Sequence, residues 1–438
     1  MSIYRPKCLI MFFSACLSAT LGVTPACLAW QKYTYSYINS SGASVGPPKL
    51  TKASDFSNEG FALVTTIEKT GDSNLRTRVM RTDGSFCPIA NELEPQAVPS
   101  DGWILCKRLA ASSAEQPLKS NGGTNRFTFV NASGARFPLE FDVAGVFSHG
   151  LAPIMLNGRF GLVKSNGSLK LESKAVGITE FGQFAEGFVA AAQGQRWGYL
   201  NSAGKWVVKP EYKSASPMHS RWGQVEVFST SKSQNVFTLV DATGKTCGKT
   251  FSKLEPFEDG VAAAAIHKEL GQGRGVDIWG LLGANGKWIL EPRYSLIGRL
   301  SSGLRVFQDG KKFGYLSNNG ELILQPKYSL AGPFSAGLAW VVPTSNSELS
   351  FIDKLGHPVI SMRRGRIDFR YLPIEFSSGL CPIPERFGAI YPKWGYIDRT
   401  GEWRILPKFD KAFPFHNGFA RVGSRNHVNC SFGLRITD

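Results

Sequence analysis

The feature that most constrains this chain is a unit that recurs along nearly its whole length. Its clearest copy spans 197–225 and opens with Trp-Gly-Tyr-Leu at 197–200. The chain then turns through Asn-Ser-Ala-Gly at 201–204, returns through Lys-Trp-Val-Val at 205–208, and reaches Pro210. A second part follows in most copies: Phe-x-x-Gly, an apolar residue, and then Ala with further apolar residues.

The turn glycines of successive copies lie 33 to 45 residues apart, at Gly134, Gly167, Gly204, Gly244, Gly286, Gly320, Gly356 and Gly401. Periods of 20–50 residues are typical of stacked repeat architectures. Short apolar runs separated by Gly- and Pro-containing turns indicate strands. The sequence therefore predicts an all-β fold: a tandem array of about ten antiparallel β-meander repeats, as an open curved array or a propeller-like ring.

Each unit predicts three strands, with room for a short fourth at 210–212. A hairpin turn that ends on Gly uses positive φ, and Asp or Asn at its start accepts backbone N–H bonds. The Gly after the first aromatic allows a neighbouring backbone or ring to approach closely. Pro at the end of the second strand is expected to mark where pairing stops. Trp197 and Trp394 are expected in the core, and unequal loops are expected after Pro210, Pro292, Pro326 and Pro407.

This arrangement resembles the bacterial WG-repeat family, whose units read aromatic-Gly-Tyr-Ile-Asp, a Gly-Lys turn, Trp-Val-Ile, Pro and Phe-x-x-Gly-Leu-Ala. The unit from Trp394 to Ala420 matches best, followed by those at Trp197, Trp279 and Phe313. The resemblance covers 125–438 well and 33–124 weakly. It implies a β-repeat scaffold, of a kind often exported and without a settled activity, and supplies no catalytic residues.

The first 29 residues read as a secretory signal peptide. Arg5 and Lys7 precede an apolar run, and small residues at 26–29 fit cleavage after Ala29. Lipid attachment at Cys27 and an uncleaved anchor are the weaker alternatives. The predicted organisation is a signal at 1–29, degenerate repeats at 30–124 and a WG-type array at 125–438. We expect an exported monomer, periplasmic or extracellular, without a membrane span.

The formal charge of +16 falls to +14 when Arg5 and Lys7 leave with the signal. A diffuse positive field favours anionic partners such as envelope glycans, although it also suits an inert basic surface. Nucleic acid is not expected, because only 363–366 clusters bases tightly. The mature cysteines are Cys87, Cys106, Cys247, Cys381 and Cys430. Cys87 and Cys106 are the expected pair in an oxidising compartment, and the remaining pairing stays open.

No motif predicts a catalytic, cofactor-binding or metal-ligating residue. His149 and His416 read as one tolerant turn position, and Asp241, Asp353 and Asp398 read as turn formers. The glycines at 271–275 lack the Lys-Ser/Thr of a phosphate loop. We therefore expect a non-enzymatic scaffold that binds a protein or an anionic glycan through variable loops. The alternative is a secreted propeller-type carbohydrate-active enzyme whose acids converge at a central axis.

Overall fold

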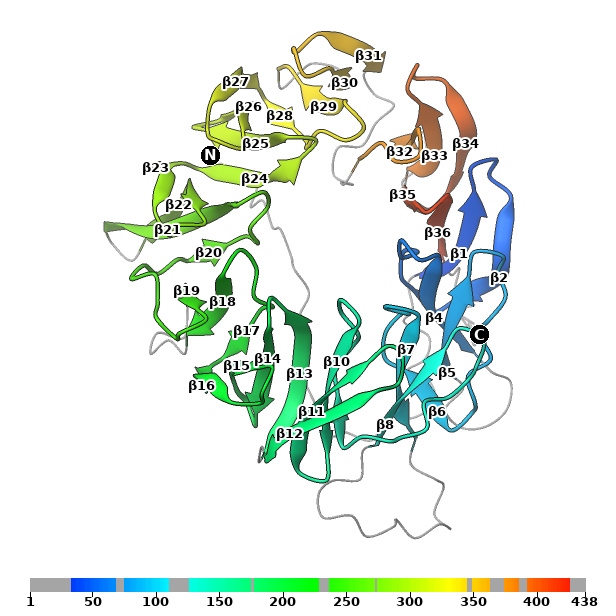
Figure 1. The fold of residues 1–438 in the computed structure, drawn as a ribbon. Helices are drawn as coiled ribbons and strands as arrows, with labels where there is room; N and C mark the ends of the chain where they lie inside the picture. Colours follow the sequence, from blue (N-terminus) through cyan, green and yellow to red (C-terminus); the bar gives the residue numbers. More distant parts are fainter. Residues whose placement is uncertain are drawn as a thin grey trace, which may run out of the picture. The chain divides into compact units, whose positions relative to one another are not determined.

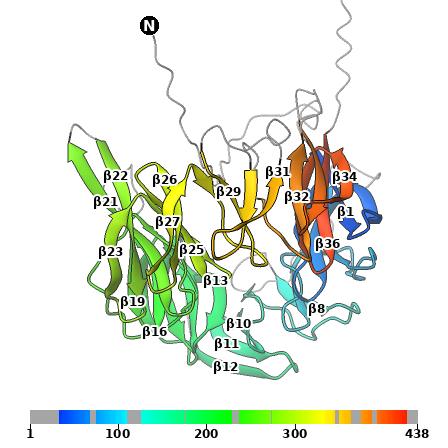
Figure 2. The same ribbon diagram turned by 90° about the horizontal axis from the view of Figure 1, so that it is seen from above.

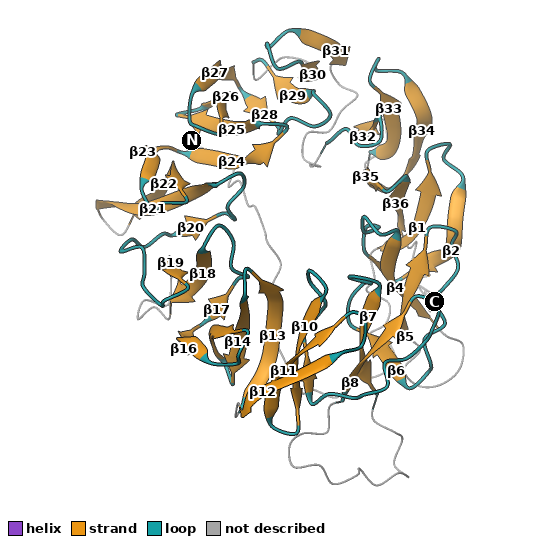
Figure 3. Ribbon diagram, in the orientation of Figure 1, coloured by secondary structure: helices purple, strands orange, loops and turns teal. Residues whose placement is uncertain are grey.

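The computed structural model describes residues 33–67, 75–109, 126–174, 177–227, 236–271, 274–344, 349–362, 374–385 and 392–425. These belong to one compact unit, Tyr33–Arg425. Throughout these ranges the regular structure consists of 36 strands and turns, with no helix (Figure 3). The predicted all-β class is therefore confirmed. Nothing in the described ranges is a helix long and apolar enough to cross a membrane.

The strands form ten small antiparallel sheets. Six sheets have four strands: β35 (Lys411–His416), β36 (Phe419–Arg425), β1 (Tyr33–Asn39), β2 (Ser44–Leu50); β9 (Val143–Ala144), β10 (Leu151–Leu156), β11 (Arg159–Lys164), β12 (Leu169–Lys174); β13 (Ile178–Ala185), β14 (Phe188–Gln193), β15 (Arg196–Asn201), β16 (Trp206–Tyr212); β20 (Lys253–Leu254), β21 (Val261–Gly271), β22 (Arg274–Gly283), β23 (Trp288–Tyr294); β24 (Leu296–Ser301), β25 (Leu304–Asp309), β26 (Lys312–Ser317), β27 (Leu322–Tyr328); β28 (Leu330–Ala331), β29 (Ala339–Val342), β30 (Leu349–Ile352), β31 (Pro358–Met362). Four sheets have three strands: β3 (Lys52–Ala53), β4 (Phe61–Ile67), β5 (Leu75–Arg81); β6 (Leu93–Pro95), β7 (Trp103–Arg108), β8 (Phe127–Asn131); β17 (Ser214–Ala215), β18 (Trp222–Val227), β19 (Val236–Asp241); β32 (Leu380–Glu385), β33 (Lys393–Asp398), β34 (Trp403–Phe409).

The two ends of this unit meet in one sheet, which closes the array. β1 pairs antiparallel with β36, in continuous register from Tyr33 opposite Arg425 to Asn39 opposite Phe419. The closing blade thus takes its inner strands from the C-terminal side and its outer strands from the N-terminal side (Figure 1). The choice between an open array and a ring is settled: the sheets are the ten blades of a β-propeller. The segment 432–438 lies outside the described residues, and β36 is the strand that pairs with the first hairpin.

The blades are out of phase with the repeat read from the sequence. The hairpin β26–β27 supplies the third and fourth strands of its blade, and the Phe-x-x-Gly phrase that follows it, at 334–337, lies between the first and second strands of the next blade. The strand that follows each phrase therefore pairs with the next hairpin. β14, for example, pairs with β15 from Phe188 opposite Asn201 to Gln193 opposite Arg196. Because every unit straddles two blades, each repeat links its neighbours covalently.

The expectation that Pro ends strand pairing is wrong. Pro210 lies inside β16, whose pairing continues to Tyr212 opposite Trp197 across a register shift. Pro292, Pro326 and Pro407 lie inside the equivalent strands β23, β27 and β34. These are edge strands, in which Pro removes a donor that no neighbouring strand needs.

The expectation of a close approach at the WG glycine is confirmed. A Cβ on Gly198 would lie 2.4 Å from the Val208 carbonyl oxygen, because the outer strand crosses directly over this position. The same carbonyl approach recurs at Gly280, Gly314 and Gly395, at 2.4, 2.5 and 2.5 Å. Real Cβ atoms do not approach this closely, so any other residue would displace the outer strand.

Aromatic side chains fill the spaces between blades, as predicted. One cluster joins Trp279 and Tyr294 of one blade to Ile297 and Phe307 of the next. Trp394 is only 5% exposed, whereas Trp197 is half-buried at the margin of its cluster.

Tyrosines at one repeat position add a polar link to this packing. The hydroxyl of each donates to a backbone carbonyl 17 residues further on, in the next blade. The pairs are Tyr37 to Ser54 (2.5 Å), Tyr199 to Ser216 (2.7 Å), Tyr315 to Gly332 (2.8 Å) and Tyr396 to Phe413 (2.9 Å). Each of these buried hydroxyls is therefore satisfied.

The predicted Cys87–Cys106 disulfide is not formed. Both are free thiols in one apolar cluster, as is buried Cys381 elsewhere in the ring. Burial raises the pKa of the Cys106 thiol to about 12 and raises that of Cys87 as well. Thiolate is the reactive form, so both side chains behave as apolar core residues. Cys430 lies outside the described residues.

Candidate functional site

The turns between the first and second strands form a repeated junction between blades. The two central residues of these turns have positive φ, as in Asp101 (51°) and Gly102 (80°). In several blades the Ser of the phrase donates to the Phe carbonyl of the next phrase: Ser100 to Phe147 at 2.7 Å, Ser301 to Phe334 at 2.5 Å, Ser335 to Phe376 and Ser377 to Phe415. This end of the ring is built for structural contact.

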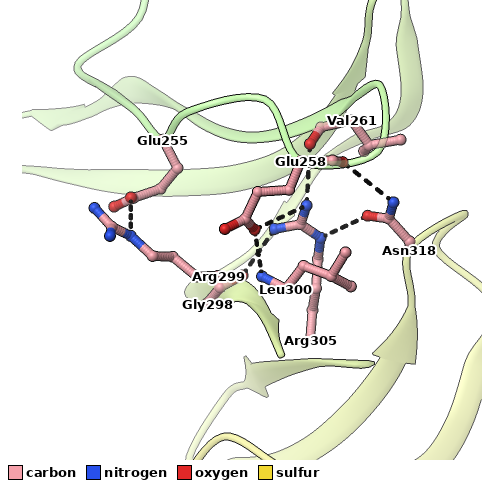
Figure 4. A network of polar contacts seen from close by, with 8 residues as sticks. All are labelled: Glu255, Glu258, Val261, Gly298, Arg299, Leu300, Arg305 and Asn318. Atoms are coloured by element: carbon pink, nitrogen blue, oxygen red, sulfur yellow. Dashed lines mark hydrogen bonds and ion pairs between the residues drawn. The ribbon is translucent and has the colours of Figure 1, made fainter. Parts of the chain in front are cut away.

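Arg305 is the one charged residue at a position where other blades have small or apolar side chains such as Ala262 and Ala339. Its side chain is fully buried, which lowers its pKa, while Glu258, Glu255 and Asp259 act in the opposite direction. Figure 4 shows its guanidinium between two blades. It donates to the Val261 carbonyl (3.0 Å), the Gly298 carbonyl (3.2 Å) and Asn318 Oδ1 (3.0 Å).

Carboxylates complete this network. Glu258 Oε2 lies 3.8 Å from Arg305 and accepts a bond from the Leu300 amide at 2.8 Å. Glu255 pairs with exposed Arg299 at 2.7 Å. Glu255 and Glu258 belong to the β20–β23 blade, and their partners Arg299, Leu300 and Arg305 belong to the β24–β27 blade. The network therefore joins two blades. Sequence reasoning missed it, although a lone Arg at an Ala position was visible.

The predicted turn carboxylates behave as expected. Asp398 Oδ1 accepts bonds from Thr400 N (2.8 Å) and Glu402 N (3.2 Å), and the Thr400 hydroxyl holds its pKa down at about 2. Asp241 and Asp353 accept equivalent backbone bonds, and both pKa values are lowered.

The two histidines do not share one position. His149 has the positive φ of the turn, whereas in the last blade that residue is Asn417 and His416 ends β35. Their alignment was therefore wrong by one residue. Over the ranges the structure covers, no three His, Cys, Asp or Glu side chains are grouped to hold a metal ion.

Length variation lies at the turns between the second and third strands, not after the prolines. The glycine of the next phrase follows eleven residues after each of Pro292, Pro326 and Pro407. In contrast, the turn between the second and third strands ranges from two residues after Leu156 to eighteen after Arg108. The variable loops were therefore expected in the wrong place.

The same turns carry exposed apolar side chains. Leu270 and Val276 lie on the long β21–β22 hairpin, which Figure 2 shows reaching past β23. Ile67, Leu75 and Leu109 lie where other hairpins leave the sheets. In an antiparallel meander the second-to-third turns all leave the blades at one end. We call these five residues, Ile67, Leu75, Leu109, Leu270 and Val276, the hairpin-end surface.

A pocket of about 430 Å³ opens between β31 and the next blade. Met362, Ile383 and half-buried Trp403 supply apolar walls, and Glu385 and Glu402 supply carboxyl groups. Glu385 is 3% exposed. Both acids come from the β32–β34 blade, whereas the enzyme alternative expects acids from several units.

Comparison with solved structures gives matches at low identity. A eukaryotic initiation factor is 12% identical, with 91% of this chain and 100% of that chain covered and a TM-score of 0.45. Apo AztD from Citrobacter koseri is 14% identical, covering 69% and 95%, with a TM-score of 0.32. Dipeptidyl peptidase 4 from Porphyromonas gingivalis is 10% identical, covering 81% and 58%, with a TM-score of 0.39. Similarities of this size establish no function.

A search of the curated proteins gives no match. The family model described as WG containing repeat matches six segments: 35–66, 136–160, 197–220, 279–313, 313–342 and 394–425. The segments reach from β1 to β36, and they include the strands whose glycine lies beneath the outer strand. These matches support placing the chain in the WG-repeat family.

Proposed function

We propose that this protein is a non-enzymatic scaffold that binds a protein partner at its hairpin-end surface. The observation that carries the proposal is a difference between the turns at the two ends of the ring. The opposite end has uniform turns engaged in contacts between blades, while the variable turns and five exposed apolar side chains share this end. Ile67, Leu75 and Leu109 belong to the neighbouring blades β3–β5 and β6–β8, and Leu270 and Val276 belong to one hairpin of another blade. Exposed apolar groups that lie together mark interaction surfaces.

Export is part of the proposal. The sequence of residues 1–29 supports it, and those residues lie outside the described structure. The buried free thiols are compatible with an oxidising compartment, because burial keeps the Cys87 and Cys106 thiols protonated. N-terminal sequencing of the protein from a cell-envelope fraction tests it: export predicts a chain that begins at Trp30.

The binding test compares two matched variants in a crosslinking experiment on cells. Leu270→Asp places a charge on the hairpin-end surface. Leu355→Asp places one on a turn between third and fourth strands, at a side chain that is 74% exposed. We expect Leu270→Asp to lose a specific crosslinked partner that wild type and Leu355→Asp retain. Equal partner recovery by all three proteins would contradict the proposed surface.

A carbohydrate-active enzyme is the second candidate, and the 430 Å³ pocket is the observation that favours it. An aromatic wall beside two carboxyl groups suits a sugar ring, and paired carboxyl groups perform glycoside hydrolysis. Glu385→Gln and Glu402→Gln would each abolish hydrolysis of a glycan panel if this reading holds. Absence of hydrolysis by the wild-type protein would count against this second candidate.

A further inference from the structure

The turns between the first and second strands have two central amides that take no part in the strand ladder. In the β28–β31 blade, Ser335 and Leu338 exchange their backbone bonds, at 2.7 and 3.0 Å. Ala336 and Gly337 lie between them, with φ of 49° and 84°. Positive φ at both central residues is typical of a two-residue hairpin turn. Each such turn therefore presents two neighbouring N–H donors, which need an acceptor from another part of the molecule or from its surroundings.

One of these turns shows what the two donors bind. The carboxylate of Glu186, in the preceding blade, accepts from Ser220 N at 2.8 Å and from Arg221 N at 2.9 Å, with one bond to each oxygen. Asp101 makes a similar contact with the turn of the blade that follows its own, because its Oδ2 accepts from Gly150 N at 2.8 Å. Hydrogen bonds to an ionised acceptor are stronger than those between neutral groups. The turn is thus a receptor for a carboxylate, which at these two places the chain itself supplies.

The turn of Ala336 and Gly337 lacks an internal carboxylate. The repeat position of Glu186 is occupied in the preceding blade by Ser302, whose hydroxyl donates to the Phe334 carbonyl at 3.4 Å. Among the residues that the structure describes, none accepts a bond from the Ala336 or Gly337 amide. Ala336 is also exposed. The two donors are therefore open to an acceptor from another molecule.

A cation lies beside this turn. Arg399 Nη2 is 3.9 Å from the point where a Cβ of Gly337 would stand. Arg399 is exposed, and it forms no hydrogen bond or ion pair with any residue in the described part of the chain. Its neighbour Asp398 pairs with Arg404 instead, at 2.8 Å. We call Ala336, Gly337 and Arg399 the open-turn site.

The other turns without a bound carboxylate differ from the open-turn site. Lys354 has the repeat position of the Arg399 side chain one blade earlier, 4.0 Å from the Cβ position of Gly303. The turn that precedes Gly303 carries Asp259, so an acidic residue is already present there. At Gly379 and Gly418 nothing lies within 4 Å of the Cβ position. Only the open-turn site, among the turns the structure describes, combines free amides, a neighbouring cation and a preceding turn without an acid.

We propose that the open-turn site binds a glutamate or aspartate side chain of a partner protein. The carboxylate accepts from the Ala336 and Gly337 amides, as the Glu186 carboxylate does at its own turn, and pairs with the Arg399 guanidinium. An amino-acid side chain is the occupant because this chain already uses one at the equivalent place. The site is at the end of the ring opposite to the hairpin-end surface, so it goes beyond the proposed function.

The first test uses the full chain and a fluorescent peptide with blocked ends, Gly-Ser-Glu-Glu-Ser-Gly, in an anisotropy titration. We expect saturable binding and a loss of at least about fivefold in affinity for Arg399→Ala. Lys354→Ala is the matched control, because it removes the same charge from the same repeat position, and it should bind like wild type. A peptide with Gln in place of both Glu should not bind. Equal affinities of the two variants, or of the two peptides, would overturn the proposal.

The amide donors are tested by supplying the missing carboxylate from the chain. Ser302→Glu places a glutamate at the repeat position of Glu186, and the two residues have nearly the same φ, 52° and 50°. The new carboxylate should occupy both amides and abolish peptide binding. Ser302→Gln has a similar shape without the charge and should weaken binding less. Melting curves establish that each variant is folded.

Two outcomes would contradict the assignment. If Ser302→Glu binds the peptide as tightly as wild type, the turn amides are not the site. If a galacturonate trimer displaces the peptide at an equal or lower concentration than a free Glu peptide does, the occupant is a glycan and not a protein side chain. Leu270→Asp should bind the peptide like wild type, which separates this result from the hairpin-end test.

Discussion

The Val208 carbonyl oxygen lies 2.4 Å from the point where a Cβ of Gly198 would stand. The third and fourth strands of the blade are thus in backbone contact at the glycine of the WG pair. This contact explains why the repeat requires glycine there: the φ of Gly198 is outside the positive range, so space and not backbone conformation decides the residue.

Gly198→Ala should therefore destabilise the protein by about 1–3 kcal/mol, the usual cost of overpacking. The measurement is chemical unfolding. Gly182→Ala is the matched control, because its nearest neighbour would be the Ala190 side chain at 3.3 Å, and the expected loss is smaller. Equal stability of the two variants would contradict the role of the crossing strand.

Trp394→Ala should cost about 3–5 kcal/mol, because it empties a large core site. Trp197→Ala should cost clearly less, since the Trp197 side chain is half-buried. Thermal unfolding of both variants tests the order. A melting temperature of Trp394→Ala within one degree of wild type would show that this ring does not support the core.

Arg305→Ala should destabilise the ring by about 3–5 kcal/mol, because it removes the positive charge beside Glu258 and leaves the Val261 carbonyl without its donor. Arg305→Lys should restore little, since one ammonium cannot reproduce the three directions of the guanidinium bonds. Arg299→Ala is the control and should change stability by less than about 1 kcal/mol, because its ion pair is exposed. Rescue by Lys would show that charge alone suffices.

The buried tyrosines should make the protein sensitive to alkali. Desolvation raises the pKa of Tyr199, Tyr315 and Tyr396 above the ordinary value of 10.0. A phenol with a raised folded-state pKa stabilises the fold below the unfolded pKa and loses that contribution as pH rises above it. Stability should therefore fall above about pH 10, and ultraviolet titration should show these phenols ionising together with unfolding. Tyr199→Phe should lower stability by about 1 kcal/mol through its lost hydrogen bond.

The repeat sequence was sufficient to predict the class, the number of units, the turn chemistry and the close approach at Gly198. These depend on local properties: the Gly positions, the Asp and Asn side chains that accept turn bonds, and the aromatic spacing. The phase of the blade was not predictable in the same way, because β14 pairs with β15 rather than with the hairpin that precedes it. Choosing between the two pairings requires knowing that β1 pairs with β36.

The candidate site was predicted less well, for a related reason. Pro210 reads as a strand end in isolation, but it is permitted inside β16 because that strand is an edge. Arg305 is recognisable only by comparison between blades. Arg305 is unusual because its equivalents are small or apolar.

The closing blade has a consequence for the order in which the molecule is made. Tyr33, at the start of β1, bonds through its hydroxyl to Arg425, 392 residues later. The first hairpin leaves the ribosome long before β36 is made. Until then Tyr37, Ile38 and Leu50, which are buried in the finished fold, lack the strand that helps to cover them. Contacts of such long sequence separation form slowly, and the exposed early segment is prone to misassembly. During synthesis, the apolar side chains of β1 therefore stay exposed until β36 has been made.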